Sequence, residues 1–142
     1  MSLFLPQSLR RVSLAGSQAW HDGAVVTHDD IRAAALALPD THERASYGGR
    51  PSFRTTSKMF CWIRDDPEAL VVWVDTEEDK EMLITSDPAK FFTTAHYDGH
   101  PIMLVRLEAV DVDEISELVT DSWRLRARKR TVANWDADHG SV

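Results

Sequence analysis

The chain has little cysteine and no long apolar run, and both scarcities limit what kind of protein it can be. Its 142 residues include one cysteine, Cys61, so an intramolecular disulfide is excluded. A domain of this length buries roughly 68–70% of its unfolded surface and therefore needs no disulfide or metal to stabilise it. No apolar run approaches the roughly 18 residues that span a membrane. Since no signal peptide is recognisable either, the sequence predicts a cytoplasmic protein with no membrane partner.

Motifs that define common catalytic and cofactor sites are also missing. The sequence contains no G-x-G-x-x-G fingerprint, no phosphate-binding G-K-[ST] segment and no G-x-S-x-G nucleophile elbow. Cys61 lies between Phe60 and Trp62, and burial in such apolar surroundings keeps a thiol protonated and inert. The carboxylates stand mostly at predicted helix starts and turns. The sequence therefore predicts a protein that is not an enzyme and holds no cofactor.

The charge is acidic in total and uneven along the chain. The formal net charge is −7, which argues mildly against general binding of nucleic acid, although a local patch matters more than the total. One acidic cluster contains Asp75, Glu77, Glu78, Asp79 and Glu81. One basic run without intervening acids contains Arg124, Arg126, Arg128, Lys129 and Arg130. These cations either stabilise the C-terminal end of a helix dipole or contact phosphate groups. If the helix continues, Arg126 and Arg130 lie one turn apart.

Residues 26–135 form one predicted domain, between an N-terminal extension at 1–25 and a C-terminal tail at 136–142. Capping boxes at Thr27/Asp30 and Asp111/Glu114 predict two helices, and Thr76 begins another. The apolar stripes of the first and last helix are Ile31, Ala34, Ala35 and Leu38, and Ile115, Leu118, Val119 and Ser122. Short segments at 51–55, 58–64 and 69–74 with brief links predict antiparallel strands. The third is apolar on both faces, which indicates a central strand covered on two sides or facing a partner.

A further hairpin is predicted around Asp98-Gly99. Segments 92–97 and 102–107 flank this dipeptide, which suits the positive φ angles of a tight turn. Such a turn would place His96 and His100 on opposing strands, where two histidines and an aspartate could in principle bind zinc. Polar residues at a hairpin tip explain the same pattern without metal, and we expect no metal site here.

Two separated stretches carry a resemblance to a known family. The first is Ser46-Tyr47-Gly48-Gly49-Arg50-Pro51-Ser52-Phe53-Arg54, continued by Lys58-Met59-Phe60, and the second is Phe91-Phe92-Thr93-Thr94-Ala95-His96-Tyr97-Asp98-Gly99-His100. Together they resemble the MmcQ/YjbR family of small bacterial proteins over residues 26–135. The resemblance implies an α+β fold, a two-layer α/β sandwich with an antiparallel sheet of about five strands in the order α-β-β-β-α-β-β-α, similar to secretion chaperones. Members of the family are commonly labelled DNA-binding.

Two functional hypotheses follow from the residues and the resemblance. The first is a protein that binds DNA weakly and salt-dependently, with phosphate contacts from Arg124, Arg126, Arg128, Lys129, Arg130, Arg54 and Lys58. The second is a non-enzymatic module for a small ligand or a protein partner, with a ligand surface formed by Tyr47, Gly48, Arg50, Pro51, His96, Tyr97 and Trp123. The Gly48-Gly49 pair either lets a ligand approach the backbone or satisfies the geometry of a helix-to-strand connection. Only the first hypothesis predicts binding to unrelated DNA that weakens steeply with salt.

Overall fold

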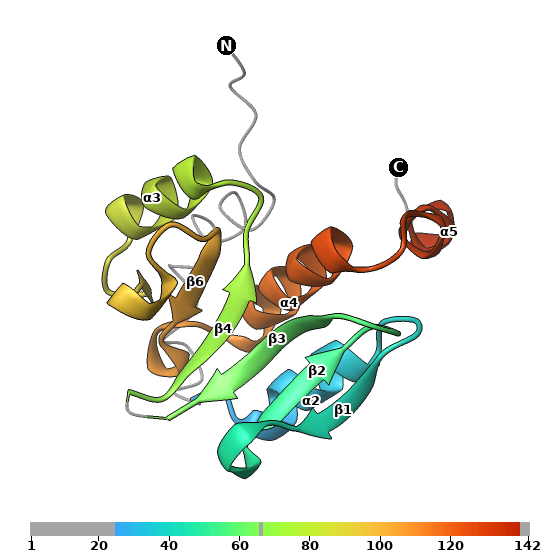
Figure 1. Ribbon diagram of the computed structural model, residues 1–142, viewed down its shortest axis with the longest axis horizontal. Helices are drawn as coiled ribbons and strands as arrows, with labels where there is room; N and C mark the ends of the chain where they lie inside the picture. Colours follow the sequence, from blue (N-terminus) through green and yellow to red (C-terminus); the bar gives the residue numbers. More distant parts are fainter. Residues whose placement is uncertain (1–24, 66, 140–142) are drawn as a thin grey trace.

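The computed structural model describes residues 25–65 and 67–139, which form an α+β fold around one antiparallel sheet (Figure 1). The sheet has six strands in the order β1-β2-β3-β4-β6-β5, and all neighbours are antiparallel. The strands are β1 His42–Ala45, β2 Pro51–Arg54, β3 Met59–Arg64, β4 Ala69–Trp73, β5 Phe91–Phe92 and β6 Ile102–Val105. The predicted fold class is confirmed, with six strands where about five were expected.

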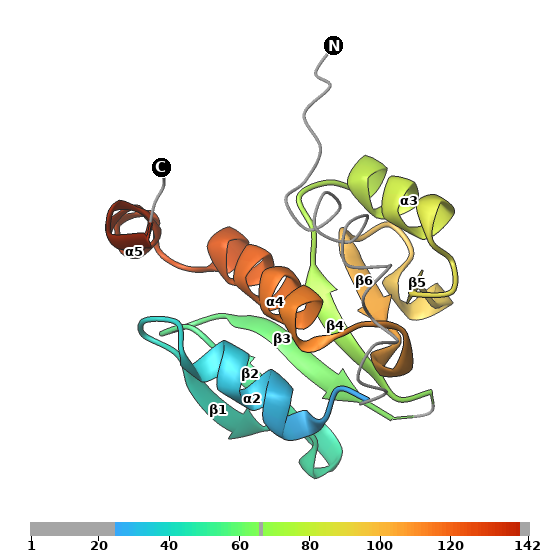
Figure 2. The same ribbon diagram turned by 180° about the vertical axis from the view of Figure 1, so that it is seen from behind.

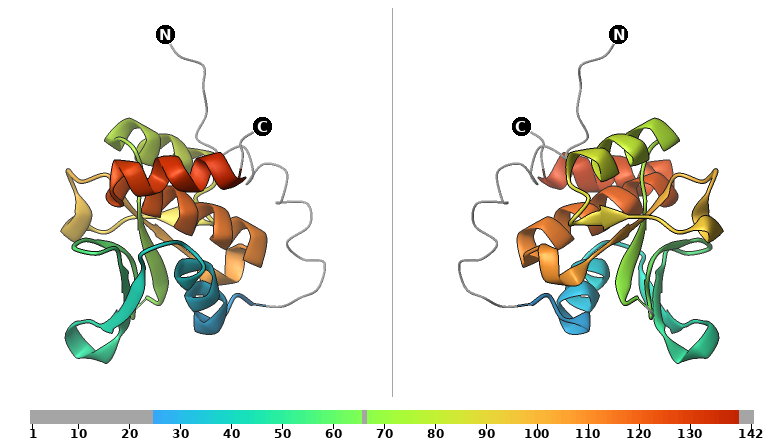
Figure 3. Two further views of the ribbon diagram at one scale, coloured as in Figure 1. Left: turned by 90° about the vertical axis from the view of Figure 1, so that its right-hand side faces the viewer. Right: turned by 90° about the vertical axis from the view of Figure 1, so that its left-hand side faces the viewer.

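The helices form a layer on one face of the sheet. Helices α2 His28–Leu36 and α4 Val112–Arg126 lie side by side across this face (Figures 2 and 3). Helix α3 Glu77–Ser86 lies beside β5 and β6, and α5 Lys129–His139 follows α4 with none of its residues buried. Short 3-10 turns occur at η1 Tyr47–Gly49, η2 Ala95–Tyr97 and η3 Leu107–Ala109. We call the opposite side of the sheet, which α2 and α4 leave uncovered, the open face.

Helix caps form as the sequence predicts. Thr27 accepts a hydrogen bond from the backbone of Asp30, whose carboxylate accepts one from the Thr27 backbone N–H at 2.9 Å. Asp111 and Glu114 form the same reciprocal pair at the start of α4. Each box satisfies two backbone donors that a helix start would otherwise leave unpaired.

The core has two parts, one on each face of the sheet. On the helix side, the central strand β4 contributes Leu70 and Val72, both fully buried, to a cluster that includes Ile31 and Ala35 of α2 and Ile115, Leu118 and Val119 of α4. On the open face, Val71 packs with a smaller cluster that includes Tyr97 and Leu104. The strand is therefore covered on two sides, as its doubly apolar pattern indicates.

Helix α4 also inserts a hydroxyl group between two strands. Strands β3 and β4 are paired from Arg64↔Ala69 to Cys61↔Val72. At the next position the Ser122 hydroxyl takes the place of a direct bond, since it accepts from the Trp73 backbone N–H at 2.8 Å and donates to the Phe60 carbonyl. Ser122 is fully buried. The helix layer is therefore joined to the sheet by hydrogen bonds as well as by apolar packing.

The predicted hairpin around Asp98-Gly99 is wrong in its details. Strands β5 and β6 do pair, but β5 ends at Phe92, and η2 occupies most of the rest of the predicted strand. Asp98 has φ −59° and ψ 136° and Gly99 has φ 80°, while the His100 N–H donates to the Tyr97 carbonyl at 3.1 Å. These values define a type II turn, which closes a loop and does not continue the twist of two flanking strands.

Two other elements differ from the sequence-based description. Strand β1 was not predicted, and α5 continues without a break past residue 135, where the C-terminal tail was expected to begin. The predicted N-terminal extension lies almost wholly outside the described residues. Within residues 25–65 and 67–139, no helix is both long and apolar enough to cross a membrane.

Candidate functional site

The basic run is divided by the end of α4. Helix α4 ends at Arg126 with Ala127 as its C-cap, and α5 begins at Lys129. The cations therefore do not share one continuous helix, and the regular one-turn spacing that continuation would give is absent. Each cation has to be placed by its own contacts.

Arg124 and Arg126 are engaged within the fold. The Arg124 guanidinium lies 2.6 Å from a carboxylate oxygen of Asp136 and 5.2 Å from the ring centroid of Trp135. Arg126 reaches the open face, where its guanidinium stacks 4.1 Å above the Trp73 ring and its Nε donates to the Met59 carbonyl at 3.3 Å. Partial burial lowers the pKa of Arg126, yet an arginine stays charged at any physiological pH. Both guanidinium groups thus stabilise the structure around the end of α4.

The remaining cations of the run are exposed. Arg128, Lys129 and Arg130 have no carboxylate partner among the described residues. Two contacts tie this segment to the sheet. Thr131 bonds to Asp40, just before β1, at 3.4 Å, and Arg126 bonds to Met59, the residue that follows Lys58 in the turn between β2 and β3. We call the exposed cations Lys58, Arg128, Lys129 and Arg130 the basic end. Arg54, at the last position of β2, is half-buried beside it.

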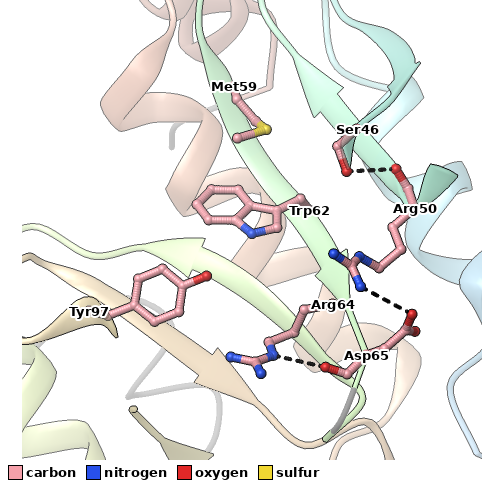
Figure 4. Close-up of a pocket in the computed structure, with 7 residues that line it drawn as sticks. All are labelled: Ser46, Arg50, Met59, Trp62, Arg64, Asp65 and Tyr97. Carbon is pink, nitrogen blue, oxygen red and sulfur yellow. Dashed lines mark hydrogen bonds and ion pairs between the residues drawn. The ribbon is translucent and has the colours of Figure 1, made fainter. Parts of the chain in front are cut away.

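A shallow cleft of about 290 Å³ lies on the open face (Figure 4). Figure 4 shows two aromatic rings and two guanidinium groups that point into the same space from β3 and from the loops on either side of it. The lining residues are Ser46, Arg50, Met59, Trp62, Arg64, Asp65 and Tyr97. We call this depression the open-face cleft.

The predicted Tyr47 loop supplies one wall of the cleft. Gly48 and Gly49 have φ angles of 79° and 80°, which favour glycine strongly. A Cβ atom at Gly48 would lie 3.5 Å from Arg50 Nη2, so the guanidinium folds back over the loop and into the cleft. Pro51 begins β2, and the Tyr47 side chain lies outside what the structure describes.

The segment around η2 supplies the opposite wall. The buried Tyr97 ring lies 6.4 Å from Trp62, centroid to centroid, and 4.7 Å from the exposed His96 ring. Buried Lys80 fixes this segment, because its Nζ donates to the carbonyls of Tyr97 at 2.9 Å and His100 at 3.0 Å. Residues 25–65 and 67–139 contain no group of three potential metal ligands, and His96 and His100 are both exposed on a loop.

The placement of Trp123 on a ligand surface was wrong. Its side chain is fully buried in the helix-side core, with its ring 5.6 Å from that of Trp135 in an edge-to-face arrangement. The apolar stripe of α4 passes through Ser122, and the adjacent Trp123 extends the buried side of the helix. A large ring near the end of an amphipathic helix adds core volume here and offers no exposed surface.

Sequence reasoning missed five lining residues of the cleft: Ser46, Met59, Trp62, Arg64 and Asp65. The strand pattern contained part of the signal, because Trp62 and Arg64 alternate with the buried Cys61 and Ile63 and must project to the open face. No sequence pattern indicates that the loops of Arg50 and Tyr97 close on this face from either side.

Comparisons with known proteins agree with this architecture. A family model described as YjbR matches residues 36–125. The uncharacterized proteins Rv2570 of Mycobacterium tuberculosis and Mb2600 of Mycobacterium bovis are each 33% identical over 133 residues, which cover 82% of this chain and 100% of each relative. The crystal structure of the Deinococcus radiodurans protein DR2400, with the domain DUF419, matches with a TM-score of 0.59 and 24% identity over 70% of this chain and 77% of that one. This last likeness concerns the fold alone.

Proposed function

The chain belongs to the YjbR family, and from that premise we propose that it is a non-enzymatic DNA-binding protein that contacts phosphate groups through the basic end. The observation that carries the proposal is the exposure of Arg128, Lys129 and Arg130 without carboxylate partners among the described residues. A cation already paired within a protein must give up that partner before it contacts a phosphate. An unpaired cation on the surface releases counterions from DNA at no such cost.

The structure narrows the set of cations that were expected to bind. Arg124 and Arg126 are left out of the proposed contacts, because the Arg124 guanidinium binds Asp136 and the Arg126 guanidinium lies over the Trp73 ring. Lys58 joins the surface through its position beside Met59. Phosphate contacts carry no base identity, so the proposal is for binding without strong sequence preference.

The number of contacts sets the expected dependence on salt. Each phosphate neutralised on duplex DNA contributes about −0.9 to the slope of log affinity against log salt concentration. Contacts by Arg128, Lys129 and Arg130 alone give a slope near −2.7, and the addition of Lys58 and Arg54 gives a slope near −4.5. A slope inside this interval is the expected result for the wild-type protein.

The test is a titration of labelled duplex DNA of unrelated sequence, at a series of salt concentrations. An Arg128→Gln/Lys129→Gln/Arg130→Gln variant should lose most binding, because all three phosphate contacts are removed. An Arg128→Lys/Arg130→Lys variant is the matched control, since it keeps the charge and should keep the slope. Failure of the wild type to bind at low salt, or wild-type binding by a folded glutamine variant, would overturn the proposal.

A further inference from the structure

The open-face cleft lies next to the basic end and contains two aromatic rings that the proposed phosphate contacts do not use. We propose that the protein prefers single-stranded DNA to duplex DNA, because one unpaired base stacks on Trp62 in the cleft while phosphate groups contact the basic end. The inference rests on the proposed function and names the form of DNA that it concerns. It adds a base contact that tolerates any sequence, since every base has a flat π face.

The site for the base is a corner formed by Trp62 and Tyr97 (Figure 4). Their ring centroids are 6.4 Å apart and their planes meet at 51°. A third ring inserted between two parallel rings needs about 7 Å, twice the normal contact distance of about 3.5 Å. The corner is too narrow for insertion, but one planar ring can lie on Trp62 and touch Tyr97 with its edge. Aromatic rings favour these offset and edge contacts.

Two neighbouring aromatic rings of the open face are already covered. A guanidinium lies 4.1 Å from the centroid of each, Arg126 over Trp73 and Arg106 over Phe92. Trp62 instead lines the cleft, and no guanidinium of the described residues stacks on its ring. The fold thus covers the rings on either side and leaves this one facing the cleft.

The charged side chains of the cleft are engaged and suit an uncharged group. Arg50 Nη1 lies 3.3 Å from a carboxylate oxygen of Asp65, so these two charges cancel. Arg64 Nε donates to the Asp65 backbone carbonyl at 3.2 Å. The edge of a base carries both donors and acceptors of hydrogen bonds. Because the Arg50 guanidinium donates and the Asp65 carboxylate accepts, the pair suits such an edge, and no net charge in the cleft is required.

The cleft and the basic end are continuous along β3. Met59 lines the cleft, and the residue before it is Lys58 of the basic end. Trp62 follows Lys58 by four positions, a distance of about 13 Å at the usual rise of a strand. A DNA strand with the duplex rise of about 3.4 Å per nucleotide covers this distance with about four nucleotides. One short strand therefore reaches both the cations and the corner.

The size of the cleft and the structure of a duplex favour an unpaired base. The volume of about 290 Å³ is at the lower end of the usual range for small-molecule sites, roughly 300–1,000 Å³, and suits one base of one or two fused rings. In a duplex the faces of the bases are covered by their neighbours, so a base has to leave the helix before it can stack on a protein ring. A single strand offers its bases without that cost.

The test is a fluorescence anisotropy titration of the full chain against three labelled probes over a series of salt concentrations. The probes are an oligothymidine strand of about 12 nucleotides, an abasic strand of the same length and a duplex of the same length. The abasic strand keeps the phosphates and lacks the bases, so oligothymidine should bind at least about fivefold more tightly. At about 0.15 M salt oligothymidine should also bind more tightly than the duplex. Each phosphate contact contributes a slope of only about −0.7 on a single strand against about −0.9 on a duplex.

Variants separate the base contact from the phosphate contacts. Trp62→Leu should weaken oligothymidine binding at least about fivefold at every salt concentration and leave the slope unchanged, and Trp62→Phe should restore part of the affinity. Phe92→Leu is the matched control and should bind normally, because Arg106 already covers that ring. The triple glutamine variant of the basic end should instead flatten the slope. In ¹⁵N-labelled protein, the indole N–H signal of Trp62, assigned by its loss in Trp62→Phe, should shift saturably with oligothymidine and much less with the abasic strand.

The outcomes distinguish this inference from the proposed function. Equal affinity for oligothymidine and the abasic strand, tighter binding of the duplex at about 0.15 M salt, or unchanged affinity in a folded Trp62→Leu variant would overturn the base contact. If the triple glutamine variant still loses binding in that case, the proposed phosphate contacts stand. Oligothymidine binding that survives in the glutamine variant and is lost in Trp62→Leu would overturn the phosphate contacts alone. Absence of binding to all three probes at low salt would overturn both.

Discussion

We expect the Ser122→Ala substitution to destabilise the protein by about 2–4 kcal/mol, a large loss for the removal of one oxygen atom. The Ser122 hydroxyl replaces a direct bond between β3 and β4, since it accepts from the Trp73 N–H and donates to the Phe60 carbonyl. Alanine at this position would remove the hydrogen-bond partner that the Ser122 hydroxyl provides to the Trp73 N–H and to the Phe60 carbonyl. The side chains of Ser122 and Phe60 are fully buried, so water has little access to replace it.

The magnitude follows from the two orphaned groups. A buried donor without a partner costs about 1–3 kcal/mol, and an orphaned carbonyl generally costs somewhat less. Their sum, reduced by partial relaxation of the strands, gives the expected 2–4 kcal/mol. A domain of ordinary stability has roughly 5–15 kcal/mol in total, so the midpoint of unfolding should shift clearly.

Urea denaturation followed by circular dichroism measures this loss. Ser116 lies exposed on the same helix, and Ser116→Ala controls for the better helix propensity of alanine, with an expected change below about 0.5 kcal/mol. If β3 and β4 can close and form their bond directly, Ser122→Ala will cost less than about 1 kcal/mol. That result would refute the reasoning, because it would show that α4 does not hold the strands apart.

Two further predictions concern other buried groups. Cys61 is fully buried and burial strongly raises the pKa of its thiol, so a thiol reagent should label it only after denaturation; rapid labelling of the native protein would contradict this. Lys90 Nζ lies 2.5 Å from a carboxylate oxygen of the buried Glu114 and 3.7 Å from that of Asp87, and Lys90→Met should cost about 3–5 kcal/mol near pH 7 in urea denaturation. Burial raises the pKa of Glu114, so protonation favours the folded state and the loss should shrink as pH falls toward about 5. An equal loss of unfolding free energy near pH 7 and near pH 5 would contradict the attribution of this loss to the buried, charged Glu114 carboxylate.

The parts of the fold that the sequence predicted are those with local signals. The capping boxes at Thr27 and Asp111 mark the helix starts, because a side chain three residues away completes each one. Strands β2, β3 and β4 were predicted from short extended segments joined by brief links. These features depend on residues that are near each other in the chain.

The parts that were missed depend on contacts between distant segments. Strand β1 consists of His42–Ala45, all exposed, and it has no apolar alternation to indicate an edge strand. The Ser122 hydroxyl bonds to Trp73, which lies 49 positions earlier in the chain, and to Phe60, which lies 62 positions earlier. The burial of Trp123 follows from the same approach of α4 to the sheet. For the candidate site, Arg50 and Tyr97 belong to the predicted ligand surface and both line the open-face cleft, but most of the other lining residues come from elements that only the fold brings together.

The acidic total and the proposed DNA contacts are compatible because the opposite charges lie on different sides of the molecule. Helix α3, which carries most of the acidic cluster, packs beside β5 and β6, while the basic end adjoins the turn after β2 (Figures 1 and 2). Within the acidic cluster, burial and the nearby Asp75 carboxylate raise the pKa of Asp79. Strands β3 and β4 separate β2 from β6, a distance of about 14 Å at the usual strand spacing.

This separation determines how the salt titration should be analysed. The Debye length is about 8 Å at 0.15 M salt and about 30 Å at 0.01 M. Near physiological salt the acidic side is therefore screened from DNA at the basic end, and the slope reports the phosphate contacts. At very low salt the repulsion from the net charge of −7 reaches the DNA and weakens binding, which flattens the curve. A slope measured only there would count too few contacts, so the expected slope of about −2.7 to −4.5 applies above the salt concentration at which the curve becomes linear.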